Sequence, residues 1–316
     1  TDTFLCDRGS RKVNMPRFSD MVIAPGFSGT VSNGFGVVYY VSNTTNPGEF
    51  QGSRGTERQG RSPRNPLATI QAAVDEAVAG RGDVVVIQRG TYTETVTINK
   101  SGLTLLGAVP YGYPDHVIIR GRTVFRGDNI SAYNTEFFSN SASSASLVVG
   151  DGTTESVSAY LYNCSFASNG TTEPACGALV SGGNDHSFIK CRFIDNTRGL
   201  IVHAGIVSFA SGLRVEDCEF LENTTVDFGT GASGDSINQT LGEDLGIRNL
   251  ICVDNYFGGG ETIPTDFVNI VGTSSGFMSG NRFASATNAS ATITIPGTIL
   301  YATAATEAGW STARPA

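Results

Sequence analysis

The stretch VEDCEFLEN, residues 215–223, is repeated in outline twice upstream, as LYNCSFASN at 161–169 and FIKCRFIDN at 188–196. Each copy contains an apolar residue, a cysteine, a phenylalanine and a final asparagine, and successive copies begin 27 residues apart. Weaker copies surround three further phenylalanines, Phe137, Phe257 and Phe283. A period of this size is typical of a solenoid, in which each unit buries its apolar face only against its neighbours.

The composition of the repeat indicates strands and excludes helical repeats. Each unit is a short apolar run ended by Gly, Asn, Ser or Thr, the residues that turns favour. Within 161–223 no long run has helical period. The step from the strand residue Leu161 to Phe166 is an odd number of positions, so strict alternation must break between them. The sequence therefore predicts an all-β solenoid with a corner inside each repeat.

Stacking such units brings equivalent residues of adjacent strands to about 4.8 Å from each other. Three structural ladders are expected from this register. They are an interior cysteine ladder (Cys164, Cys191, Cys218), a stacked aromatic column (Phe166, Phe193, Phe220) and an asparagine ladder at a turn (Asn140, Asn169, Asn196, Asn223).

Upstream of the repeats, NPLATIQAAVDEAVAGRGDVVVI reads as a short amphipathic helix followed by a strand. Asn65 is suited to cap a helix and Pro66 to occupy its first turn, whereas Gly80 and Gly82 are suited to end it. We expect this helix, near 66–79, to cover the open end of the solenoid, where unpaired strand edges would otherwise invite another chain.

Together, this entry segment and the repeats, over residues 37–285, resemble the right-handed parallel β-helix, or pectin-lyase-like, superfamily, including β-helical decoration and spike proteins of tailed bacteriophages. The resemblance implies a right-handed single-stranded parallel β-helix over 37–285. Two non-repeat arms are expected outside it, an extended N-terminal arm at 1–36 and a C-terminal strand and tail at 286–316.

The N-terminal arm combines spaced apolar residues with a basic cluster and cannot bury a core of its own. Such a segment is either a disordered leader or an extended arm that becomes ordered against a partner. We expect it to dock on a partner. The candidate docking residues are Phe4, Arg8, Arg11, Lys12, Arg17, Phe18, Met21 and Phe27.

Charge and cysteine usage limit the possible partners. The chain has a net charge of −8, and its basic surplus is confined to residues 1–66, so an acidic body would repel nucleic acid. No apolar run approaches the roughly 20 residues that span a bilayer, so no membrane insertion is expected. Six cysteines without the spacing of a metal or redox site favour buried thiols and assembly in a reducing cytoplasm.

Catalytic signatures are sparse. Adjacent rungs place Asp195 beside Glu222, at a separation that suits a retaining glycosidase, and this is the best catalytic pair available. Three histidines, His116, His186 and His203, fit neither a serine triad nor a zinc motif. No cofactor or metal is predicted, and the resemblance covers the structural pattern of the superfamily without its catalytic residues.

Two functions from different classes remain. The first is a non-enzymatic virion protein of a tailed bacteriophage, a capsid-decoration or head-fibre subunit that forms a homotrimer on the virion surface and contacts capsid or tail proteins. The second is a tailspike or secreted polysaccharide lyase or glycoside hydrolase that acts on an acidic or capsular glycan, such as a host surface glycan.

Overall fold

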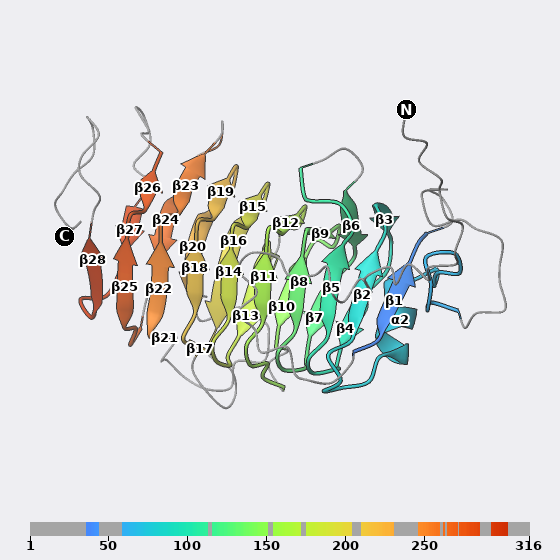
Figure 1. The fold of residues 1–316 in the computed structure, drawn as a ribbon. Coiled ribbons are helices and arrows are strands. Elements are labelled where there is room, and N and C mark those ends of the chain that lie inside the picture. Colours follow the sequence, from blue (N-terminus) through green and yellow to red (C-terminus); the bar gives the residue numbers. More distant parts are fainter. Residues whose placement is uncertain are drawn as a thin grey trace, which may run out of the picture.

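A computed structural model of the chain describes residues 36–43, 59–112, 116–150, 154–171, 175–203, 210–230, 246–259, 262, 264–270, 272–284 and 292–302. These residues wind into a right-handed parallel β-helix with three long sheets, here called sheets A, B and C (Figure 1). Successive strands visit A, B and C in turn, and all their pairings are parallel.

Sheet A has ten strands and begins with the first strand of the chain. Its members are β1 (Val38–Val41), β2 (Val84–Ile87), β5 (Thr104–Gly107), β8 (Ser131–Tyr133), β11 (Tyr160–Tyr162), β14 (Ser187–Ile189), β18 (Arg214–Glu216), β22 (Leu250–Val253), β25 (Gly276–Ser279) and β28 (Ile299–Ala302).

Sheets B and C have eight strands each. Sheet B consists of β3 (Gly90–Tyr92), β6 (Val117–Arg120), β9 (Thr135–Ser139), β12 (Ser165–Ser168), β15 (Arg192–Ile194), β19 (Glu219–Leu221), β23 (Tyr256–Gly259) and β26 (Arg282–Phe283). Sheet C consists of β4 (Val96–Ile98), β7 (Thr123–Phe125), β10 (Leu147–Val149), β13 (Ala178–Ser181), β16 (Arg198–His203), β20 (Val226–Thr230), β24 (Asp266–Asn269) and β27 (Thr292–Thr294). A small fourth sheet pairs β17 (Ala210–Ser211) with β21 (Ile247–Arg248).

The predicted corner lies between sheets A and B. At the corners of five successive rungs, one non-glycine residue has left-handed backbone geometry, with φ between 52° and 56°. These equivalent residues are Asn134, Asn163, Lys190, Asp217 and Asp254. The left-handed residue turns the chain within two positions, so that the following cysteine and phenylalanine both point inward.

The phenylalanine column is present and longer than its three strongest members. Six rings, from Phe137 through Phe166, Phe193, Phe220 and Phe257 to Phe283, stack with centroid separations from 4.6 to 5.4 Å. All six are buried. Since each ring contacts the rings above and below it, the column joins neighbouring repeats into one core.

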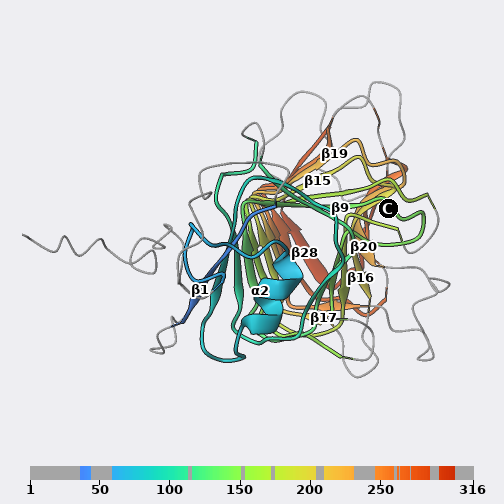
Figure 2. The same ribbon diagram turned by 90° about the vertical axis from the view of Figure 1, so that its right-hand side faces the viewer.

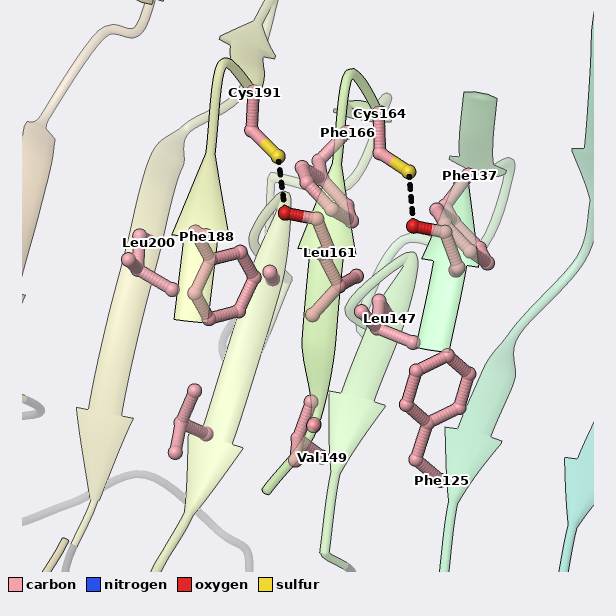
Figure 3. Close-up of a cluster of buried hydrophobic side chains, with 14 of the residues drawn as sticks. Phe125, Phe137, Leu147, Val149, Leu161, Cys164, Phe166, Phe188, Cys191 and Leu200 are labelled. Carbon is pink, nitrogen blue, oxygen red and sulfur yellow. Dashed lines mark hydrogen bonds between the residues drawn. The ribbon is translucent and has the colours of Figure 1, made fainter. Parts of the chain in front are cut away.

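The cysteine ladder lies at the same corner. Cys164, Cys191 and Cys218 are buried free thiols, and each donates a hydrogen bond to a carbonyl of the preceding rung. Figure 3 shows the bonds of Cys164 and Cys191. Two later rungs place Asn255 and Asn281 at this position, and the Asn255 side-chain oxygen accepts from the Cys218 amide at 2.9 Å. A thiol and a carboxamide therefore serve the same corner.

The asparagine ladder is shorter than predicted. Asn196 and Asn223 are buried, and the Asn196 side-chain nitrogen donates to the Asn223 oxygen at 3.0 Å. Asn140 and Asn169 are instead exposed, which corrects the prediction for these two residues. In their rungs the strand of sheet B is longer, and the connection to sheet C begins later, so both asparagines fall on a loop.

The N-terminal helix is also shorter than predicted. Helix α2 covers Ile70–Glu76, and its cap is Thr69, whose side chain accepts from the Ala72 amide, in place of Asn65. Leu67 already forms a bridge with Val41 of β1, and residues 59–65 form turns and bends, so the helix begins only after Leu67. The helix lies across the end of the solenoid, as expected (Figure 2).

The solenoid continues past the boundary expected at residue 285. β27 pairs with β24 in sheet C, and β28 pairs with β25 in sheet A. Ile293 and Ile295 pack on the core. β27 is the C-terminal strand expected within 286–316, but this last turn has neither the cysteine nor the phenylalanine of the repeat, so the sequence pattern did not show that it continues the solenoid or that β28 follows.

Candidate functional site

The outward face of sheet A is unusually apolar for a surface. Alternate residues of each strand point out of the solenoid, and hydrogen-bonded register aligns them in two columns along its length. The apolar and aromatic members are Val38, Tyr40, Val84, Val86, Leu106, Tyr133, Tyr160, Tyr162, Ile189, Ile251, Val253, Phe277 and Leu300. We call this surface the A face; Figure 1 is viewed onto it.

Exposure on the A face rises toward the C-terminal end. Val86 and Tyr133 are buried, Ile189 and Ile251 are half-buried, and Phe277 and Leu300 are 41% and 75% exposed. Polar residues interrupt the columns at Thr104, Ser131, Ser187 and Ser279, and the exposed apolar surface is continuous over Ile251, Phe277 and Leu300. Exposed apolar surface of this kind marks a binding surface more often than a solvated one.

Charge is scarce on the A face. Among its described outward positions the charged residues are Arg214 and Glu216, two positions apart on β18. Arg214 Nε donates to Glu216 Oε2 at 2.5 Å, so the two charges neutralise each other within the chain.

A second surface feature lies at the corner between sheets A and B. Here a cleft of about 570 Å³ opens beneath the loop of Tyr111 and Gly112. Its other lining residues are Asn163, Lys190, Cys191, Arg192, Asp217 and Glu219.

The charges of this corner cleft are paired across rungs. Arg192 Nε lies 2.6 Å from Glu219 Oε2, and Lys190 Nζ lies 3.9 Å from Asp217 Oδ2. The Arg192 guanidinium also lies 5.7 Å from the centre of the Tyr111 ring. These side chains are half-exposed, so the ion pairs contribute little stability, and both cations and both carboxylates are accessible to a ligand.

Next to the cleft, His116 anchors the Tyr111 loop. Its ring stacks edge-on against Tyr111 at a centroid distance of 4.8 Å, and its Nε2 lies 2.5 Å from Glu136 Oε2. These two contacts hold the Tyr111 ring over sheet B.

The predicted catalytic pair is not part of the cleft. Asp195 and Glu222 occupy equivalent left-handed positions on adjacent rungs, where sheet B leads to sheet C, with φ of 56° and 57°. Asp195 is exposed and Glu222 half-buried. The structure brings the two residues together as expected, and their catalytic role stays a prediction.

His186 is a structural residue. Its ring is fully buried, Nδ1 accepts from the Ala159 amide at 3.2 Å, and Nε2 lies 3.1 Å from the Gly182 carbonyl. Burial lowers the pKa of this imidazole, which favours the neutral form. His203 is buried in sheet C.

A buried acid, Asp227 on β20, was not predicted from the sequence. It is fully buried, and its Oδ1 accepts from the Asn223 side chain at 2.8 Å, while its Oδ2 has no hydrogen-bond partner among the described residues. Burial raises the pKa of this carboxyl to about 7. Asp227 extends the Asn196–Asn223 ladder by one polar group.

The remaining predictions concern the docking arm, metal binding and membrane insertion. The docking residues of the arm, from Phe4 to Phe27, lie outside the described residues. Within the described ranges, no group of three or more His, Cys, Asp or Glu side chains is arranged to hold a metal ion. The described helix has seven residues, too few to cross a membrane.

Comparison with known proteins gives likeness of fold alone. No protein-family model and no curated protein matches the chain. Among solved structures, pectate lyase Pel9A is similar with a TM-score of 0.45 and 15% identity, over 83% of this chain and 78% of that one. The pectin methylesterase of Aspergillus niger gives 0.42 and 17%, over 87% and 91%. The ORF18 protein of Geobacillus virus E2 gives 0.39 and 16%, over 68% and 49%. These likenesses concern how the chain winds, which by itself does not determine what it binds.

Proposed function

We propose that the protein is a non-enzymatic structural subunit of a tailed-bacteriophage virion. In this role it is a capsid-decoration or head-fibre subunit that is assembled in the host cytoplasm, forms a homotrimer and docks on capsid or tail proteins through residues 1–36. The observation that carries the proposal is the apolar A face, because such a surface suits permanent association better than catalysis.

The geometry of the corner cleft is consistent with this role. Its two carboxylates, Asp217 and Glu219, each already have a cationic partner on the neighbouring rung. Asp195 and Glu222 lie at a turn outside the corner cleft, and neither residue lines it. Neither pair has the water-excluded setting in which enzymes place acid and base groups.

The test is location and mass in a purified particle. Proteomics of gradient-purified virions should detect the chain in a fixed copy number, and antibody labelling should place it on the particle surface. A chain deleted for residues 2–35 should keep its far-ultraviolet dichroism and lose attachment. A full-length chain found only free in the lysate would contradict the proposal.

The second candidate function is a tailspike or secreted enzyme acting on an acidic or capsular polysaccharide. The corner cleft favours it, since Tyr111 offers an aromatic surface and Lys190 and Arg192 offer cations for a glycan acid. Incubation with host capsular polysaccharide, followed by reducing-sugar and unsaturated-product assays, tests this function. Oligosaccharide release that Asp195→Ala, Glu222→Ala or Glu219→Gln abolishes would replace the structural proposal.

A further inference from the structure

The A face requires a partner of particular shape. Its ten strands, at about 4.8 Å per interval, make a strip about 43 Å long that is only three or four residues wide. A globular partner would cover part of such a strip. A second copy of this chain, set side by side with the solenoid axes parallel, offers a strip of the same length.

Charge also favours a second copy. With a net charge of −8, two chains repel each other over most of their surfaces. On the A face the charged residues are the neutralised pair Arg214 and Glu216, so copies meet there with little repulsion.

The positions of Arg214 and Glu216 on β18 allow opposite charges to meet between two copies. Arg214 lies in one outward column of sheet A and Glu216 in the other, on a single rung. In a cyclic assembly about an axis parallel to the solenoids, equal rungs lie at equal height. The Arg214 column of one copy then meets the Glu216 column of the next.

We propose that the A face is the surface through which copies of this chain associate side by side into a closed cyclic oligomer, with Ile189, Ile251 and Phe277 as apolar anchors and Arg214 meeting Glu216 between copies. This inference rests on the proposed structural role, and it identifies a second copy of the chain as the partner of the A face.

The chain provides a closely matched pair of variants for a test. Ile189 and Ile194 are half-buried isoleucines of one rung that point outward, the first from sheet A and the second from sheet B. The full-length wild type should sediment as an oligomer, with three copies expected. Ile189→Glu should shift it to monomer or weaken association at least about tenfold, whereas Ile194→Glu should leave the mass unchanged.

Leu300→Glu guards against misfolding, because a side chain 75% exposed contributes little to the fold. Dichroism of each variant reports folding, and loss of association with unchanged dichroism is the expected result. A monomeric wild type at micromolar concentration would overturn the proposal. So would an oligomer whose mass is unchanged in both Ile189→Glu and Leu300→Glu, which would place association elsewhere.

A charge experiment separates contacts between copies from contacts within one. Arg214→Glu makes the rung doubly acidic and Glu216→Arg makes it doubly basic, so each variant alone should associate more weakly. Mixing the two variants should restore association above that of either alone. No gain on mixing would contradict the Arg214–Glu216 contact between copies.

Failure of this interface is distinguishable from failure of the proposed function. A monomer found on purified particles would refute the interface and leave the structural role standing. An oligomer that dissociates as expected, but releases oligosaccharides from a glycan, would support the interface and refute the non-enzymatic role.

Discussion

Sheets A and C both place apolar side chains on their outer faces, but the outer row of sheet C is buried, whereas the C-terminal part of the A face is exposed. Val124, Val148, Leu179 and Ile201 form a buried outer row on sheet C. Ala145 and Cys176, from the connections between sheets B and C, pack against this row. On sheet A, the corresponding side chains of the C-terminal rungs, Phe277 and Leu300, are exposed.

Connection length explains the difference. The connections from sheet B to sheet C after β9 and β12 are long, and one residue of each, Ala145 and Cys176, packs on the outer row of sheet C. After β11, β14, β18, β22 and β25, sheet A leads to sheet B through two residues, such as Asn163 and Cys164, and corners that short do not fold back over the outer face of sheet A. This difference in covering is what the proposed interface on the A face requires.

The largest loss of stability is expected for a substitution inside the solenoid, and substitutions in the two outer rows can be compared with it. Phe193→Ala should lower the free energy of unfolding by about 3 to 5 kcal/mol, because it opens a cavity in the ring column. The loss should spread to the rungs of Phe166 and Phe220, which stack on Phe193. Hydrogen exchange resolved by rung measures this spread, and protection lost in one rung only would argue against a continuous column.

The two outer rows should differ when the same kind of truncation is made in each. Leu179→Ala, in the covered row of sheet C, should cost about 2 to 4 kcal/mol. Ile189→Ala, on the A face, should cost less than about 1 kcal/mol in the monomer. Urea unfolding at a concentration that keeps the chain monomeric measures both, and equal losses would erase the distinction between a covered and an uncovered row.

The free energy of unfolding should also depend on pH, through the buried carboxyl of Asp227 in sheet C. Its pKa is about 7 in the folded chain, above the ordinary value of 3.8, so the folded state favours the protonated acid. Stability from this group is complete below about pH 4 and falls as the pH rises to about 7. The difference is on the order of a few kcal/mol.

Asp227→Asn should flatten this slope, because the side chain no longer ionises. The measurement is the urea midpoint from pH 4 to pH 8, in wild type and variant. Glu222→Gln on the same side of the solenoid serves as the matched control. An Asp227→Asn protein with the wild-type slope would show that another group causes the pH dependence.

A further effect is expected at the corner between sheets A and B, which neither outer row includes. Cys191→Ser should lower the free energy of unfolding by about 1 to 3 kcal/mol, since it buries a hydroxyl in a site shaped for sulfur. Cys191→Ala should be milder. Thermal unfolding compares the two variants, and equal melting temperatures would mean that the site tolerates a polar atom, as the rungs of Asn255 and Asn281 do.

The fold could be predicted because its repeat contains residues of distinctive kind. Phenylalanine, cysteine and asparagine recur at one spacing, and stacking in register follows from strand geometry alone. Boundaries were less predictable. Asn169 matches the repeat by position, yet one extra strand residue in its rung moves it onto a loop, and β28 lacks the repeat residues although its backbone pairs normally.

The surface sites could be predicted only in part. The stacking of Asp195 and Glu222 follows from register, but the cleft beneath Tyr111 depends on a loop whose return over sheet B has no local sequence signal. The A face left a trace, because strands such as YLY at 160–162 and LICV at 250–253 are apolar at outward as well as inward positions. Burial on both sides is ordinary for parallel strands, so this trace does not tell a covered face from an uncovered one.

The left-handed corner residues form a row whose chemistry is independent of the core. Asn163, Lys190 and Asp217 differ in size and charge, yet they hold the same backbone angle within a few degrees. Over the five rungs from Asn134 to Asp254, the fold therefore fixes one attachment point per rung, and leaves the group placed there open. A protein engineer could write a pattern of charges or chemical labels along this edge, with its pitch set by strand spacing and its content chosen freely.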